Sequence, residues 1–172
     1  MDSMGKIVSI FLIVIMMFFV PMGIQAEKEE MMIESYVLAK SAYFVEHIRS
    51  NGAISREMYE QYQKQLAQTG FVYDIHMEHK QMITNTEGEQ EQEEEEKGLF
   101  CYRSAFYEND ILETLFDKNE VYTMKQGDFF FLSVTSKTKG LSDKIKSYFL
   151  IPTDSSPAIH VSMGGRIRDE TH

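Results

Sequence analysis

The residue types best suited to chemistry gather in the segment His76-Met77-Glu78-His79. Imidazole and carboxylate groups bind zinc and also act as general acids or bases. On a β-strand, however, His76 and Glu78 share one face while His79 points to the other. A metal hydrolase would therefore need a third ligand, such as His160, brought in by the fold. The competing interpretation is a polar strand face without metal, and we predict no catalytic, cofactor-binding or metal-binding residues.

Three further places carry reactive or phosphate-binding residue types without the partners that such sites need. Cys101 is the single cysteine, which excludes an intramolecular disulfide. We expect it to be a small apolar strand residue, with an intermolecular disulfide or a reactive thiol as alternatives. Thr135-Ser136-Lys137 lacks the Ser-x-x-Lys spacing of an activated serine. Gly164-Gly165 lacks the lysine and further glycines of a phosphate-binding loop, so we expect a bulge or a tight crossing in the final strand.

Charge excludes one class of partner. The 172 residues include 17 Lys and Arg against 27 Asp and Glu, a formal net charge of −10. Nucleic-acid binding needs clustered basic residues, so we expect no nucleic-acid partner. Part of the acidic excess lies in residues 86–97, TEGEQEQEEEEK. Like charges at this density repel, and the segment has no apolar residue to bury, which predicts a solvated, disordered loop between two strands.

The elements that would position these residues follow one apolar stretch, Ile7–Ile24, interrupted only by Ser9 as a polar residue. A spanning helix needs about 20 apolar residues, so the stretch is compatible with a membrane anchor. It also resembles a signal peptide, with cleavage after Ala26. Lys6 precedes the stretch and acidic residues follow it, so the N-terminus is expected in the cytoplasm and the rest of the chain outside the cell.

This gives two predicted regions. Residues 1–26 form a cytoplasmic tip with a transmembrane or signal segment, and residues 27–172 form an extracellular domain large enough for its own core. No Pro or Gly occurs between Gln25 and Asn51, so the membrane helix is expected to continue into an amphipathic helix over Glu27–Ser50, with a kink at Pro21. The apolar side of that second part comprises Ile33, Tyr36, Val37, Phe44 and Ile48, with Lys40 intruding.

A second helix is predicted from the N-cap Ser55 to Gly70. Strands are then expected, because Phe71–Glu78 alternates between apolar and polar residues. The further predicted strands are Leu99–Phe106, Val121–Lys125, Phe129–Thr135 and Ala158–Met163, and short helices are predicted at Ile111–Phe116 and Leu141–Phe149. A turn at Gln126-Gly127-Asp128 would join two of these strands as a hairpin. Helices followed by antiparallel strands indicate an α+β fold with helix packed on one sheet face.

Four motifs carry a resemblance to a known family. They are the helix start Gly52-Ala53-Ile54-Ser55-Arg56-Glu57-Met58-Tyr59, the turn Thr69-Gly70-Phe71-Val72-Tyr73-Asp74-Ile75, the segment Gly127-Asp128-Phe129-Phe130-Phe131-Leu132-Ser133-Val134, and the ending Gly164-Gly165-Arg166-Ile167-Arg168. The chain resembles small membrane-anchored, pilin-like or pseudopilin-like proteins of clostridia and related Gram-positive bacteria. Such proteins accompany tight-adherence (Tad-type) pilus or type II secretion-like machinery.

The resemblance implies a non-enzymatic envelope component with a pilin-like head, partnered by pilus or secretion subunits or by copies of itself through the N-terminal helix. Gly52, Gly70, Gly127 and Gly164 are expected to be turn positions. One position departs from the pattern: Ile10 is fifth after Gly5, where a pilin cleavage site has Glu. The alternative of a different class is a secreted, soluble binding protein released by signal peptidase after Ala26.

Overall fold

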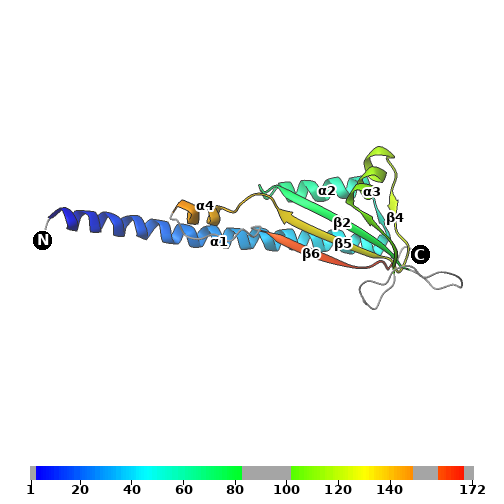
Figure 1. The fold of residues 1–172 in the computed structure, drawn as a ribbon, viewed down its shortest axis with the longest axis horizontal. Helices are drawn as coiled ribbons and strands as arrows, with labels where there is room; N and C mark the ends of the chain where they lie inside the picture. The colour runs from blue at the N-terminus through cyan, green and yellow to red at the C-terminus, as the bar shows by residue number, and fades with distance from the viewer. Residues whose placement is uncertain (1–2, 83–101, 149–158, 169–172) are drawn as a thin grey trace.

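The computed structural model describes residues 3–82, 102–148 and 159–168, and the fold is α+β (Figure 1). A long N-terminal helix lies along one face of an antiparallel sheet, and its first half extends well beyond the sheet. The acidic segment 86–97 and Cys101 lie outside the described residues, so the predictions made for them are not tested.

Helix α1 covers Ser3–Asn51, 49 residues that include Pro21. The predicted membrane helix and the predicted amphipathic helix are therefore one continuous element. The proline is tolerated although it lacks a backbone N–H, which removes one hydrogen bond from the helix. At the other end, Gly52 follows with φ 63°, and its N–H donates to the carbonyl of Ile48. Glycine at this left-handed position ends the helix, as expected.

Helix α2, Arg56–Ala67, begins at the predicted N-cap, where the Ser55 hydroxyl accepts a hydrogen bond from the N–H of Met58. Tyr59, Tyr62 and Leu66 are buried on its inner side. Gly70, with φ 78°, then reverses the chain toward the sheet. The helix thus starts and stops where capping chemistry places its ends.

The main sheet has four antiparallel strands in the order β3-β2-β5-β6. Strand β2 begins two residues later than predicted and ends four residues later, because it pairs along its length with β3 and β5. Its burial alternates as predicted, with Ile75 and Met77 buried on the inner face. The strands are β2 (Tyr73–Met82), β3 (Tyr102–Tyr107), β5 (Phe129–Ser136) and β6 (His160–Arg166).

The predicted hairpin around Gly127 is wrong. Strand β4 is only Tyr122–Thr123, and it pairs with β1, Ala53–Ile54, in a separate two-stranded sheet. Gly127 still occupies a turn, with φ 99°. Strand β4, which precedes that turn, lies instead beside the start of α2, where the N–H of Met124 donates to the carbonyl of Gly52.

Two short helical segments complete the described chain. The first is α3, Glu108–Leu112, which continues as the π-helical turn η1, Glu113–Asp117. It begins three residues before the predicted helix, and the Asp110 carboxylate accepts a hydrogen bond from the N–H of Tyr107. The second is α4, Leu141–Tyr148, which lies beside α1 at the level where α1 leaves the sheet (Figure 1).

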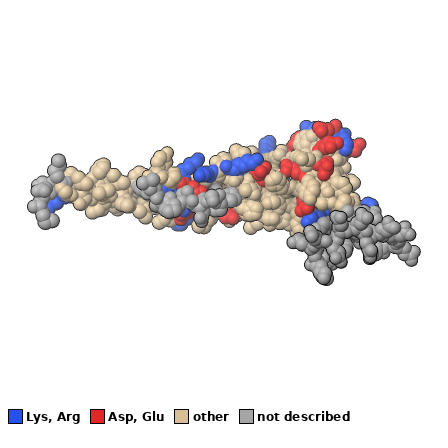
Figure 2. Space-filling model, viewed as in Figure 1, with Lys and Arg blue, Asp and Glu red and all other residues tan. Residues whose placement is uncertain are grey.

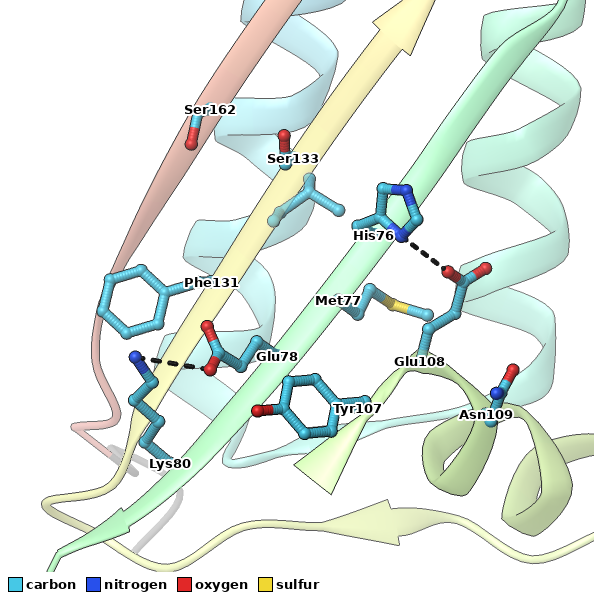
Figure 3. A pocket seen from close by; sticks show the side chains of 11 residues that line it. His76, Met77, Glu78, Lys80, Tyr107, Glu108, Asn109, Phe131, Ser133 and Ser162 are labelled. Carbon is cyan, nitrogen blue, oxygen red and sulfur yellow. Dashed lines mark ion pairs between the residues drawn. The ribbon is translucent and has the colours of Figure 1, made fainter. Parts of the chain in front are cut away.

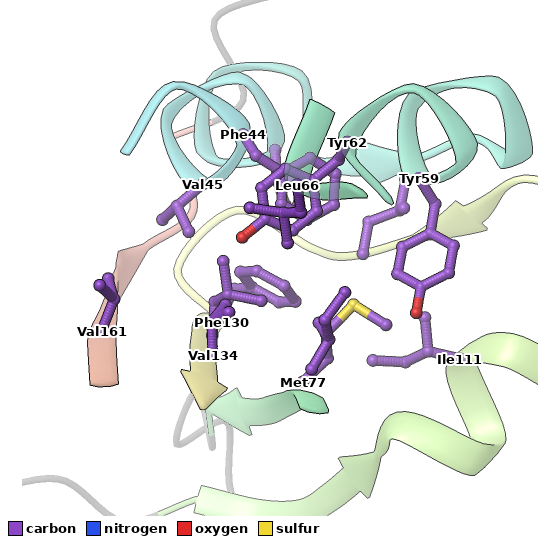
Figure 4. Packing of buried hydrophobic residues seen from close by; sticks show 14 of the residues in the cluster. Phe44, Val45, Tyr59, Tyr62, Leu66, Met77, Ile111, Phe130, Val134 and Val161 are labelled. Carbon is purple, nitrogen blue, oxygen red and sulfur yellow. The ribbon is translucent and has the colours of Figure 1, made fainter. Parts of the chain in front are cut away.

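The hydrophobic core lies between the sheet and the two helices α1 and α2 (Figure 4). Val37, Phe44 and Ile48 of α1 are buried as predicted. The Phe44 ring stacks on Tyr62 of α2, with 4.3 Å between ring centroids. Burial raises the pKa of Tyr62 to about 12, and the hydrogen bond with Ser41 opposes that rise. The inner sheet face contributes Ile75, Met77, Phe130, Leu132, Val134 and Val161.

Gly164 is not a turn position, contrary to the prediction. It lies inside β6 opposite Phe131, and the pairing of β5 with β6 continues through it. A Cβ atom there would come within 2.5 Å of the Phe131 ring. The glycine therefore serves the tight crossing that was the other expectation for Gly164-Gly165, because it allows the ring of the neighbouring strand to lie over the backbone.

Candidate functional site

The most unusual surface of the molecule is the first half of α1. Among the described residues, α1 is the one helix long and apolar enough to cross a membrane, and its most apolar window is not covered by any part of the protein. Figure 2 shows this half as a rod with few charged side chains, whereas charged side chains gather farther along. Burying exposed apolar surface is strongly favourable, so this half is suited to a membrane anchor or a signal sequence.

The apolar surface does not stop where the apolar stretch ends. Phe11, Phe18 and Met32 are 65, 71 and 73% exposed and follow one another at multiples of seven residues, close to whole turns of the helix. Tyr43, 69% exposed, continues the same side. We call these four residues the outer stripe. Val37, buried in the core, lies about 120 to 140° around the helix from Tyr43 and Met32, so this part of the stripe does not face the sheet.

Hydrogen bonds and an ion pair connect helix α4 to α1 just beyond the apolar stretch. The Glu30 carboxylate accepts hydrogen bonds from the N–H of Ser142, at 2.9 Å, and from its hydroxyl, at 2.5 Å. One turn earlier on α1, Glu27 forms an ion pair of 2.9 Å with Lys146. Glu30 thus acts as an N-cap provided by another element and satisfies donors at the start of α4.

The three residues of the hypothetical metal site are not brought together. His76 and Glu78 do share the outer face of the sheet, as predicted, but His160 lies on β6, separated from β2 by β5. Each histidine also has its own partner: Nδ1 of His76 lies 3.2 Å from Glu108, and Nδ1 of His160 lies 3.0 Å from the Thr135 hydroxyl. No group of three metal-ligating side chains forms within the described part of the chain.

His79 faces the interior, as the strand alternation predicted, and forms a buried polar network. Its Nε2 donates to Asp128 at 3.0 Å, and the Tyr122 hydroxyl lies 2.8 Å from Nδ1. Burial raises the pKa of Tyr122 to about 12, so this hydroxyl keeps its proton. His79 is 1% and Asp128 3% exposed. The network is therefore closed to solvent and holds the turn before β5 against the end of β2.

Ser136 and Lys137 do not form a nucleophile and base. The buried Ser136 hydroxyl donates to the carbonyl of Thr138 at 2.7 Å. The Lys137 ammonium lies 2.9 Å from Asp74, and its hydrogen bond holds the pKa of that carboxyl below the usual value. Both side chains have structural partners, and the two do not share a reactive geometry.

The outer sheet face carries a hollow of about 580 Å³, which we call the outer hollow. His76, Glu78 and Lys80 of β2 line it together with Tyr107 and Phe131, and Figure 3 shows these side chains with Met77, Ser133 and Ser162. At its edge, Nδ1 of His76 lies 3.2 Å from the Glu108 carboxylate, and Lys80 forms an ion pair with Glu78 at 3.3 Å. The hollow combines aromatic surface with hydroxyl, amide and carboxylate groups.

Sequence reasoning missed Glu30 and Asp128, because both act on residues far away in the chain. Glu30 was one of several acids after the apolar stretch, and nothing local distinguishes it from its neighbours. Asp128 was assigned to a turn, and its position beside Gly127 fits that role. Its carboxylate also accepts hydrogen bonds from the N–H groups of Lys125 and Met82, and only the latter bond requires the tertiary fold.

No protein-family model, curated protein or solved structure matches this chain.

Proposed function

We propose that this protein is a non-enzymatic, membrane-anchored envelope component that assembles through α1, as a pilin-like minor subunit or an accessory of a pilus or secretion apparatus. The observation that carries the proposal is the outer stripe, because its apolar side chains continue past the apolar stretch to Tyr43. An anchor alone needs apolar surface only within the bilayer. Exposed apolar side chains that recur beyond that level suit packing against another helix.

In this arrangement the N-terminus lies in the cytoplasm and the head lies outside the cell. Helices within a membrane associate through close packing of their side chains, and the same helix can continue that contact above the membrane. Lys28 and Glu29 interrupt the apolar surface at the level where the headgroups would begin. The partners are copies of this chain or subunits of the apparatus.

Release after Ala26 is the alternative, and two features favour retention. Helix α1 continues without interruption through Ala26, which is 3% exposed. Glu27 and Glu30, which hold α4, directly follow the cleavage position. Cleavage would leave this contact on the frayed first turn of a shortened helix, where backbone donors have no helical partner. The mass of the chain recovered from cells distinguishes the two outcomes.

Disulfide crosslinking tests the assembly proposal. In a Cys101→Ser background, Phe18→Cys and Met32→Cys place thiols on the outer stripe, and Lys64→Cys places an exposed thiol on α2 as the control. We expect both stripe variants to trap a second copy or a pilus or secretion subunit in cells, and the control to trap neither. Equal trapping by all three variants, or none by the stripe variants, would contradict assembly through α1.

A further inference from the structure

The outer hollow has the features of a binding site for an uncharged sugar. We propose that it binds a neutral carbohydrate through the rings of Tyr107 and Phe131. This inference rests on the hollow alone, so it does not depend on how α1 assembles. The volume of about 580 Å³ falls within the range of about 300 to 1,000 Å³ of small-molecule sites.

Two exposed aromatic rings supply the apolar part of the site. Tyr107 is 60% and Phe131 39% exposed, although both side chains belong to elements of the ordered sheet. The C–H face of a sugar ring can pack on such rings. At Phe131 it would share the ring with Phe129, which stacks at 6.2 Å between centroids, and with the Lys80 ammonium. Gly164 contributes by its lack of a side chain, since any Cβ there would collide with the Phe131 ring. Ser133 and Ser162, which have small side chains, also line the hollow, on the two neighbouring strands β5 and β6 (Figure 3).

The charges of the hollow favour a neutral ligand. Lys80 is the one Lys or Arg among the described residues that line it, and its ammonium lies 3.3 Å from Glu78 and 5.2 Å from the centre of the Phe131 ring. A phosphate or carboxylate ligand would meet Glu78 and Glu108 with little compensating positive charge. A metal ion is disfavoured because no group of three ligands forms in the described chain.

The polar groups match a ligand rich in hydroxyls. A sugar hydroxyl both donates and accepts, so it can pair with a carboxylate, an amide or another hydroxyl. Glu78 provides a charged acceptor, Ser133 and Ser162 provide hydroxyls, and Asn109 provides an amide at the edge. Hydrogen bonds to a charged carboxylate are stronger than those between neutral groups, so Glu78 is expected to contribute most among the polar residues.

Calorimetric titration of the full chain tests the proposal. The protein is kept in a detergent with a phosphocholine headgroup, because a sugar-headed detergent would compete. The probes are maltotriose, cellotriose, mannotriose and the trimer of N-acetylglucosamine. We expect at least one probe to bind, and Tyr107→Ala and Phe131→Ala each to weaken that binding by about tenfold. Glu78→Gln should weaken it by about threefold or more, through the loss of charge-assisted hydrogen bonds.

Two controls separate stacking from damage to the fold. Tyr107→Phe keeps the ring and should keep affinity within about threefold of the parent protein. Tyr148→Ala removes an exposed ring on α4, away from the hollow, and should leave affinity unchanged. The proposal is overturned if no probe binds at millimolar concentration, if Tyr107→Ala binds as the parent does, or if Tyr148→Ala weakens binding equally. Tighter binding of an acidic sugar than of its neutral counterpart also overturns it.

Discussion

Both halves of α1 carry large apolar side chains, but these side chains meet different surroundings. In the second half, Val37, Phe44 and Ile48 are almost completely buried against the sheet and α2. In the first half, Phe11 and Phe18 are mostly exposed, although they are as apolar as Phe44. Composition therefore shows that a helix needs a covering partner but does not show which one. The distribution of polar residues differs between the halves: they recur on one side of the second half and are almost absent from Ile7–Ile24, which is compatible with a membrane span or a signal.

The largest expected effect comes from shortening one phenylalanine in each half. Phe44→Ala should lower the free energy of unfolding of the head by about 3 to 5 kcal/mol, because it leaves a cavity and removes the stack on Tyr62. Phe11→Ala should change it by no more than about 0.5 kcal/mol. Urea unfolding of both variants in detergent, followed by near-ultraviolet circular dichroism, measures the difference. Similar losses in both would mean that the first half also packs on the head.

An added charge should affect membrane retention in the first half of α1 and leave it unchanged in the second half. Ile13→Arg should disfavour membrane insertion by about 3 kcal/mol, the cost of arginine near the centre of a spanning helix. Met32→Arg, on the outer stripe beyond the apolar stretch, should leave retention unchanged. The measurement is the fraction of protein that stays with membranes after alkaline extraction. If Met32→Arg releases the protein as readily as Ile13→Arg, the boundary between the halves is misplaced.

Alkaline pH should lower the stability of the head through Tyr62 of α2, whose ring stacks on Phe44 in the second half of α1. The pKa of Tyr62 is about 12 in the folded protein, against about 10 in an unfolded chain. Below pH 10 the phenol is protonated in both states and stability is unaffected. Between pH 10 and 12 the unfolded chain loses the proton first, so stability falls by up to about 1.4 kcal/mol per pH unit.

Tyr62→Phe should reduce this alkaline loss, and unfolding curves at several pH values between 9 and 12 measure it. Part of the fall in unfolding free energy with pH should remain, because the pKa of Tyr122 is also about 12. Tyr43→Phe is the matched control on α1, since Tyr43 is exposed. An unchanged slope in Tyr62→Phe would show that its phenol is not the group that resists ionisation.

The smallest expected effect lies at the junction of the halves. Glu30→Ala removes the acceptor for both Ser142 donors and should destabilise α4 by about 1 kcal/mol. Hydrogen exchange of the α4 amides should then accelerate, while that of β5 stays as in the parent. Glu34→Ala, one turn farther along α1 and exposed, is the control. Equal acceleration in both variants would rule out a specific role for Glu30.

Sequence reasoning succeeded where a feature depends on neighbouring residues. Ser55 caps α2 and Gly52 ends α1 because capping is decided within one helical turn. The inward side of β2 was predicted because strand side chains alternate strictly, which also separated His79 from His76. The continuation of α1 past the apolar stretch was also predicted, because no Pro or Gly occurs between Gln25 and Asn51.

Sequence reasoning failed where a feature depends on distant residues. A strand of two residues such as β4 has no periodicity, so its pairing with Ala53–Ile54 left no local signal. The segment around Gly127 had the composition of a hairpin, yet its first arm pairs elsewhere. The outer hollow was equally unpredictable, because Tyr107, Phe131 and Ser162 come from three strands that only the topology places together.

The continuity of α1 has a mechanical consequence. At about 1.5 Å per residue, 49 residues form a rod of about 73 Å that links the sheet to the N-terminus without a loop. A pull or a twist applied to the head would pass along such a rod instead of being absorbed by a flexible linker. Pro21 is its most compliant point, because the helix lacks a hydrogen bond there. If Ile7–Ile24 spans the bilayer, the lipid surrounds that weak point and would stiffen it, so load on the head would reach the cytoplasmic face.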